Sequence, residues 1–299
     1  MNAIFRRLKR RLFPPPAPER VLILLTNPRS GSTWLFDALR CHPAIEMHPT
    51  AVIFERLHLS GRRYPRDLCD GPNAGLRIEV APEQWAMVPC FSIAGAEQHV
   101  SPEVLRQPYA IEKAHPHFFD HYVRGFVHDL KQLGRGSTVK VIYQVRDPAS
   151  SLISFLRYKE RNPHWNARIS PHEAFEHMAH IFESMADAAA AYTGLVIDYG
   201  DLMAHFHETV ASVFDFLWPD AERNGRDPAF VSLIAAETAW EKRKAAGTPF
   251  LGGEAGPVAG RGGEYEQLFA AHEREVERCY AAYRTLLAMR TNEERSSIP

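Results

Sequence analysis

The sequence predicts an α/β protein, in which one domain is built on a central parallel sheet flanked by helices. Two apolar runs, Val21–Leu25 and Thr138–Val145, have the pattern of strands buried on both faces of a parallel sheet. Each run ends in a tight turn, and apolar residues at helical spacing follow, from about Ser32 and over Ala149–Tyr158. With 299 residues, the chain is long enough to bury one substantial core.

The chain divides into one domain, residues 20–290, and a tail at each end. Residues 1–19 form a basic, proline-rich N-terminal tail, and residues 291–299 form a C-terminal tail. Apolar residues alternate with arginine and lysine in the N-terminal tail, so it could lie on an anionic membrane surface as an amphipathic helix. The favoured interpretation is a solvated tail before the stiff linker Pro14–Pro16, and it lacks the long apolar core of a signal peptide.

The other elements follow in order along the chain. The stretch from Cys41 to Tyr109 contains many prolines and glycines, and it predicts loops and short helices rather than sheet core. Further short strands are predicted at Tyr109–Lys113 and Gly194–Asp198. Helices are predicted at His117–Leu133, Pro171–Ala191, Met203–Leu217, Phe230–Lys244 and Glu264–Arg290, and the glycine-rich stretch Gly247–Gly263 predicts a loop over a ligand.

Composition limits the function and location of the protein. The net charge of −1 gives no bulk attraction to nucleic acid, so a polyanionic ligand needs locally clustered cations. The four cysteines form no Cys-x-x-Cys pair, and His117 and His121 are spaced as chance allows among 15 histidines, so no metal site is predicted. No stretch approaches 18 apolar residues. We therefore expect a cytoplasmic protein with reduced thiols, whose contact with a membrane is limited to the basic N-terminus.

The first turn, residues 26–33, has the features of an anion site. Free N–H groups at the start of a helix and the positive end of the helix dipole attract an anion, and Gly31 lets the backbone approach it closely. The turn is not a Walker A motif, because Thr26 stands where that motif has glycine and Ser32 where it has lysine. Its cation, Arg29, lies ahead of the glycine instead.

Pro28–Leu35, PRSGSTWL, resembles the loop that opens sulfotransferases, and a second motif resembles the 3′-phosphate site of that family. In the second motif, Arg146 follows a strand and Ser154 lies eight residues later, on the predicted helix. An arginine fork at a strand end can chelate a phosphate together with a hydroxyl two helical turns on. The resemblance implies a P-loop-like sulfotransferase fold and the co-substrate 3′-phosphoadenosine 5′-phosphosulfate (PAPS), with no metal required.

Further matches extend the resemblance over most of residues 21–290. Lys113-Ala114-His115 resembles the family's Lys-Thr-His element, with alanine in place of threonine, and Tyr199-Gly200-Asp201-Leu202 resembles a segment whose aromatic ring contacts adenine. Thr238-Ala239-Trp240 resembles a second adenine contact. The residues that the resemblance places against PAPS are Arg29, Ser30, Gly31, Ser32, Thr33, Trp34, Arg146, Ser154, Tyr199, Thr238, Trp240 and Arg261.

The resemblance also implies a mechanism, in which the sulfuryl group moves in line from PAPS to a hydroxyl or amine. Arg29 and Lys113 neutralise charge on the leaving oxygen, and His115 accepts the proton of the acceptor. Relatives that act on carbohydrates often use a carboxylate as the base, so Glu46 or Glu55 stays an alternative. The family's closing Arg-Lys-Gly element is reduced here to Gly260-Arg261-Gly262, in which Arg261 is the candidate cation.

Two other functions stay open at this point. One is a P-loop kinase that uses ATP and Mg²⁺, although the missing Gly-Lys and the pair of Arg146 and Ser154 weigh against it. The other is a module that binds 3′-phosphoadenosine 5′-phosphate without catalysis, against which Lys113 and His115 weigh. The acceptor, whether a small molecule, a carbohydrate or a lipid, and the oligomeric state are not identified by the sequence.

Overall fold

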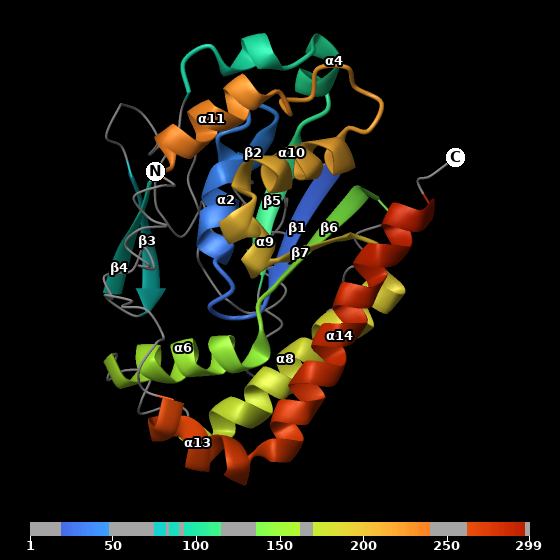
Figure 1. Cartoon of the computed structure of the whole chain (residues 1–299). Coiled ribbons are helices and arrows are strands. Elements are labelled where there is room, and N and C mark those ends of the chain that lie inside the picture. The colour runs from blue at the N-terminus through green and yellow to red at the C-terminus, as the bar shows by residue number, and fades with distance from the viewer. Residues whose placement is uncertain are drawn as a thin grey trace.

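The computed structural model describes residues 19–47, 75–81, 84–89, 93–114, 136–161, 170–239 and 262–296. In these ranges, a five-stranded parallel sheet with the strand order β2-β5-β1-β6-β7 lies between layers of helices (Figure 1). The strands are β1 (Arg20–Thr26), β2 (Ile45–Met47), β5 (Tyr109–Ala114), β6 (Thr138–Val145) and β7 (Leu195–Asp198). The predicted fold class is confirmed.

Strand β1 is the central strand of the sheet. It pairs with β5 on one side and with β6 on the other, so that Leu22 lies opposite both Ile111 and Lys140. Val21, Ile23 and Leu25 pack into the core on one face of the sheet, and Leu22 and Leu24 into the core on the other. A strand that is covered on both faces needs an apolar residue at every position, which is what the run Val21–Leu25 supplies.

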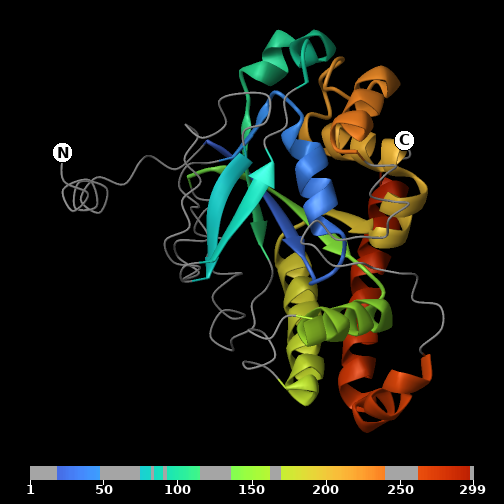
Figure 2. The same ribbon diagram turned by 90° about the vertical axis from the view of Figure 1, so that its left-hand side faces the viewer.

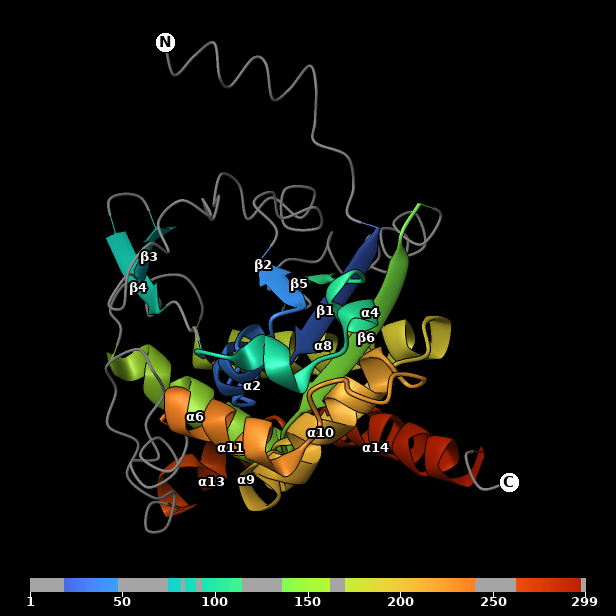
Figure 3. The same cartoon turned by 90° about the horizontal axis from the view of Figure 1, so that it is seen from above.

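Helices cover both faces of this sheet. One core is closed by α6 (Pro148–Arg161), α8 (Pro171–Ala191) and α14 (Glu273–Ser296). Of these, α8 and α14 lie side by side along much of their length (Figure 3). The short helix α13 (Gly262–Ala271) precedes α14.

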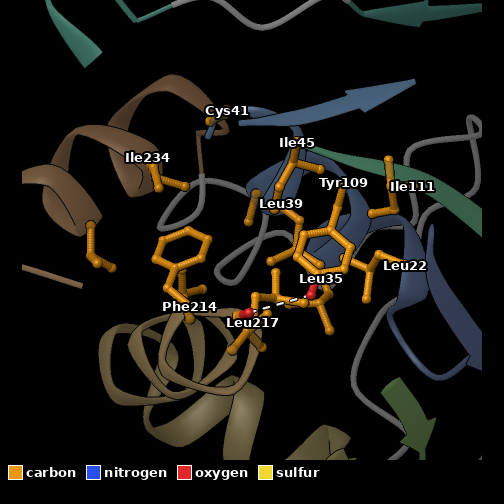
Figure 4. Close-up of a cluster of buried hydrophobic side chains, with 14 of the residues drawn as sticks. Leu22, Leu35, Leu39, Cys41, Ile45, Tyr109, Ile111, Phe214, Leu217 and Ile234 are labelled. Atoms are coloured by element: carbon orange, nitrogen blue, oxygen red, sulfur yellow. Dashed lines mark hydrogen bonds between the residues drawn. The ribbon is translucent and has the colours of Figure 1, made fainter. Parts of the chain in front are cut away.

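The opposite core is closed mainly by α2 (Ser32–Arg40), α10 (Phe206–Leu217) and α11 (Pro228–Glu237). Figure 4 shows this cluster, in which the Tyr109 hydroxyl of β5 donates a hydrogen bond of 3.4 Å to the carbonyl oxygen of Leu217. The bond joins the sheet to the last turn of α10, and it supplies the acceptor that a buried hydroxyl needs.

The stretch 41–109 contains more strand than its sequence predicts. Strand β2 adds an edge to the central sheet by pairing with β5. Strands β3 (Gly75–Ala81) and β4 (Gln84–Pro89) form a separate antiparallel pair (Figure 2). The predicted short helices are present as η2 (Ala96–His99) and α4 (Pro102–Leu105). The three residues of β2 are too few for an alternating pattern to show in the sequence.

Two segments that were predicted as single helices are each divided in two. Residues 203–217 lie partly in α9 (Tyr199–Ala204) and partly in α10, because His205 leaves the helical region with φ −132° and ψ 51°. Residues 264–290 are divided between α13 and α14, which continues to Ser296, inside the predicted C-terminal tail. Helix α11 ends at Glu237, ahead of the predicted Lys244.

Candidate functional site

The parallel strands β1, β6 and β7 end at the same edge of the sheet, and this edge carries both predicted turns and Tyr199. In the turn after β1, Arg29 has φ 67° and Gly31 has φ 74°. Gly31 is the N-cap of α2. A left-handed conformation is ordinary for glycine but strained for arginine, and such strain tends to occur at ligand sites.

The first turn packs directly against the aromatic ring of Tyr199, which begins α9 immediately after β7. A Cβ atom added at Gly31 would lie 2.6 Å from Tyr199 Cε2, so only glycine fits without a shift of the ring. The Trp34 ring of α2 lies 6.1 Å from the Tyr199 ring, centroid to centroid. The structure therefore brings together two of the three aromatic residues predicted to contact adenine.

Two buried amide side chains tie the first turn to the second turn, at residues 145–148. Asn27 Nδ2 donates to Ser151 Oγ at 2.9 Å, and Asn27 Oδ1 accepts from the Arg146 backbone N–H at 3.0 Å. Gln144 Nε2 donates to the carbonyl oxygen of Ser30 at 2.7 Å. Neither amide was predicted to belong to the site, although a polar residue at the end of a buried strand is a signal that it has a specific partner.

The predicted cations of the two turns meet at Arg29. Its Nε donates to Ser154 Oγ at 3.2 Å, and its carbonyl oxygen accepts from Arg146 Nη1 at 3.0 Å. The Arg146 guanidinium also lies 4.5 Å from the centre of the Tyr199 ring. Burial lowers the pKa of Arg146, and Tyr199 is the largest of the charged or ionisable groups that oppose this shift. Arg29, Arg146, Ser154 and Tyr199 thus form one contact group.

Lys113, the predicted cation on β5, lies on the other side of β1. Its Nζ donates to Thr33 Oγ1 at 3.1 Å and lies 5.8 Å from the centre of the Phe36 ring. Desolvation lowers the pKa of Lys113 to about 8, and the carboxylate of Asp37 opposes that shift. The ammonium group is therefore close to its titration point at neutral pH.

Two buried polar atoms at the first turn have no hydrogen-bond partner among the described residues, namely Ser30 Oγ and Gln144 Oε1. An unsatisfied buried polar atom costs about 1–3 kcal/mol, so a folded protein normally supplies a partner. Their position at the predicted phosphate loop fits a site whose partner is a bound ligand.

Not every predicted residue is seen at this edge. Thr238 is buried, and its hydroxyl donates to the carbonyl oxygen of Ile234 in its own helix, at 2.8 Å. The side chain of Glu46 on β2 is not described. His115, Trp240, Arg261, Glu55, His117 and His121 lie outside the described residues.

The described residues contain neither a metal-binding cluster nor a helix that could cross a membrane. Within the ranges that the structure describes, no group of three or more histidine, cysteine, aspartate or glutamate residues is placed to hold a metal ion. Among the described helices, none has the length and apolar character needed to cross a membrane.

No curated protein sequence matches the chain. Similar solved structures include the "Sulfotransferase Domain from the Synechococcus PCC 7002 Olefin Synthase", with 22% identity and a TM-score of 0.41 over 78% of this chain and 96% of that one. They also include "sulfotransferase STF9 from Mycobacterium avium", with 14% identity and a TM-score of 0.45 over 78% of this chain and 71% of that one.

The family comparison covers more than half of the chain. The model that describes the "Sulfotransferase family" matches residues 22–220. The matched residues begin in β1 and include both turns, Lys113 and Tyr199, so they contain the contact group at the sheet edge. The chain belongs to the sulfotransferase family.

Proposed function

We propose that the protein transfers the sulfuryl group of PAPS to a hydroxyl or amine of a small-molecule, carbohydrate or lipid acceptor. One observation carries the proposal: the turns after β1 and β6 are joined at Arg29, which contacts both Arg146 and Ser154. PAPS differs from ATP in its 3′-phosphate, so a second cation and hydroxyl beside the first phosphate loop favour PAPS. The described residues fit such a ligand.

The chain contributes charge and position to the transfer. The backbone of Ser30–Thr33 at the start of α2 holds the 5′-phosphate, and Arg146 and Ser154 hold the 3′-phosphate. Arg29 and Lys113 neutralise the charge that develops on the leaving oxygen, and such preorganised charge is commonly the largest catalytic contribution. Trp34 and Tyr199 supply apolar area for the purine. Predictions for Ser32, Thr238, Trp240 and Arg261 stay predictions.

The base that accepts the acceptor's proton is proposed to be His115, since a neutral imidazole is available near pH 7. Glu46 and Glu55 are the alternatives. His115→Gln and Glu46→Gln would separate them, because only loss of the base lowers kcat strongly while binding of 3′-phosphoadenosine 5′-phosphate is unchanged. Location in the cytoplasm and the domain boundaries also stay predictions.

The test is isothermal titration of the full chain with 3′-phosphoadenosine 5′-phosphate and with AMP, in the presence of EDTA. We expect the 3′-phosphorylated nucleotide to bind more tightly and Arg146→Ala to remove that difference. Charge-assisted hydrogen bonds contribute about 1.5–3 kcal/mol, so the loss is about 10- to 150-fold. PAPS turnover with candidate acceptors then tests transfer itself.

The matched control is Arg157→Ala, which removes an arginine of α6 whose guanidinium lies 5.9 Å from the Tyr265 ring. This variant should keep the preference for the 3′-phosphate. Equal binding of the two nucleotides by the unmodified chain would overturn the proposal, and binding of ATP that depends on Mg²⁺ would favour the kinase.

A further inference from the structure

Helix α14 lies beyond residues 22–220, yet it contacts the second turn and the end of β7, which both border the proposed nucleotide site. The Tyr280 hydroxyl donates to Asp147 Oδ2 at 2.9 Å. The Tyr283 hydroxyl donates to Asp198 Oδ2 at 2.7 Å. Residues at positions i and i+3 lie on the same face of a helix, so a single face of α14 reaches both carboxylates.

The two carboxylates are used in the same way. Asp147 precedes α6, and its other oxygen, Oδ1, accepts from the Ser150 backbone N–H at 2.8 Å. Asp198 ends β7, and its Oδ1 accepts from the Gly200 backbone N–H at 2.7 Å. In each carboxylate, therefore, one oxygen caps a helix and the other accepts a tyrosine hydroxyl.

Each carboxylate is adjacent in sequence to a residue of the contact group. Asp147 follows Arg146, and Asp198 precedes Tyr199, whose ring lies 4.5 Å from the Arg146 guanidinium. Strands β6 and β7 are neighbours, with Val145 opposite Asp198. Both negative charges consequently act on Arg146, since both raise its pKa against the effect of burial.

A carboxylate close to an arginine is a competitor for any phosphate that the arginine binds. If either aspartate turned toward Arg146, it would form an ion pair and neutralise the charge that the 3′-phosphate needs. The helix cap and the tyrosine hydroxyl use both oxygens of each carboxylate, and this holds the aspartates in their present orientation.

We propose that Tyr280 and Tyr283 are positioning residues of the 3′-phosphate site: they hold Asp147 and Asp198 in their helix-capping orientation and so keep the charge of Arg146 available to the ligand. The inference rests on the proposed function. It assigns a role in nucleotide selection to the C-terminal helix, outside the residues that the family comparison matches.

Both tyrosines remain donors throughout the neutral range. Burial, followed by the hydrogen bond to Asp147, raises the pKa of Tyr280 to about 12. Burial and the hydrogen bond to Asp198 also raise the pKa of Tyr283. A third contact lies farther along the helix, where Arg290 forms an ion pair with Asp201 in the first turn of α9.

The two hydroxyls could instead serve only to attach α14 to the rest of the core. Cys279, Ala282 and Leu286 of α14 are already buried there, so a purely structural role predicts lower stability and an equal loss of affinity for every nucleotide. The ratio of two affinities separates the alternatives, since a general loss of folded protein cancels in a ratio.

The experiment measures dissociation constants of 3′-phosphoadenosine 5′-phosphate and AMP by isothermal titration. It compares the full chain with Tyr280→Phe, Tyr283→Phe and the double variant. We expect each single variant to weaken binding of the 3′-phosphorylated nucleotide about three- to tenfold, which lies within the range for one typical hydrogen bond, while AMP binding changes less than about twofold.

The matched control is Tyr143→Phe, which removes a hydroxyl that donates to the carbonyl oxygen of Tyr192 at 2.7 Å in the same core. It should leave the affinity ratio unchanged. A rescue variant adds Asp147→Asn to Tyr280→Phe, because a neutral amide can still cap α6 but cannot neutralise Arg146. Restored affinity for the 3′-phosphorylated nucleotide is expected.

The outcomes separate this inference from the proposed function. If the unmodified chain does not prefer the 3′-phosphorylated nucleotide, both are overturned. If it does, and the tyrosine variants keep the same ratio or lose affinity for both nucleotides equally, the inference alone is overturned. Failure of Asp147→Asn to rescue, with the ratio lowered, also overturns it, because the proposed competition by the carboxylate would then be absent.

Discussion

The two sides of β1 hold their predicted site residues in different ways. On the β6 side, the buried side chains of Asn27 and Gln144 bind backbone groups of the two turns and the buried Ser151 hydroxyl. On the β5 side, a half-buried Lys113 reaches Thr33 through a single side-chain hydrogen bond. The first side is fixed by geometry before any ligand arrives, whereas the second contributes a charge whose presence depends on pH.

This difference shows where a substitution should cost stability and where it should cost only binding. A buried network that loses one member leaves its other members unsatisfied, which is expensive. A partly exposed hydrogen bond to a lysine can be replaced by water at little cost. The β6 side is therefore the half of the proposed site that the fold fixes, whereas the β5 side contributes a charge that depends on pH.

The largest effect is expected from Asn27→Ala. The substitution leaves the Arg146 backbone N–H and the buried Ser151 hydroxyl without their amide partner. We expect the free energy of unfolding to fall by about 2–4 kcal/mol, because the buried Ser151 hydroxyl and the backbone N–H of the half-buried Arg146 both lose a hydrogen bond. Urea denaturation followed by circular dichroism measures this loss.

The matched substitution on the β5 side is Thr33→Val, which removes the hydrogen bond from Lys113 but keeps the shape of the side chain. Here we expect less than about 1 kcal/mol. Equal losses from the two variants would break the comparison between the two sides.

Gly31→Ala is expected to have an intermediate effect. The new Cβ would meet Tyr199 Cε2 at 2.6 Å, and the backbone has φ 74°. Strain and the displaced ring together cost about 1–3 kcal/mol of stability, and the packing between Tyr199 and Arg146 is lost. Thermal denaturation and nucleotide titration measure the two consequences.

Gly136→Ala is the control for this variant, since a Cβ at Gly136 meets nothing within 4 Å. It should be close to neutral in both measurements. If Gly31→Ala proves as mild as Gly136→Ala, the close approach of the first turn to Tyr199 is not a constraint on the site.

The smallest effect concerns pH and tests the contribution of Lys113 on the β5 side. Lys113 is charged below its pKa of about 8 and neutral above it, so an anionic nucleotide should bind less tightly as pH rises. If only the charged form binds well, the affinity for 3′-phosphoadenosine 5′-phosphate falls up to about tenfold between about pH 7 and 9. Titration at both pH values measures the change.

Lys113→Arg provides the control, because a guanidinium stays protonated across this range. The fall in affinity between the two pH values should then disappear. An unchanged pH dependence in Lys113→Arg would assign the titration to another group.

The sequence predicted the parts of the fold that follow from continuous patterns. Strand β6 and helix α8 have the predicted bounds, since an apolar run of strand length and a capped helix after Ser170 are both unambiguous. The division at His205 was missed, because the apolar pattern continues through it and only the backbone turns away. A local change of direction leaves no trace in hydrophobic periodicity.

The site was predictable where residues act through their own charge or ring. Arg29, Arg146, Ser154 and Tyr199 are found together at one sheet edge. Asn27 and Gln144 were missed because their roles depend on which distant backbone groups lie beside them. Tyr280 was missed for a similar reason, since in sequence it is one of many apolar positions on a long helix.

The order of strands in the sheet has a consequence for the synthesis of the protein. A ribosome makes β1 early, but the partners of β1 in register begin only at Ala110 and Thr138. At about 5–20 residues per second, an apolar strand stays without its neighbours for several seconds, and exposed strands of this kind attract chaperones and other chains. A nucleotide bound at the proposed site would not shield it, because Arg146, Tyr199 and α14 are translated later still. The strand at the centre of the finished molecule is thus exposed while the chain is being made.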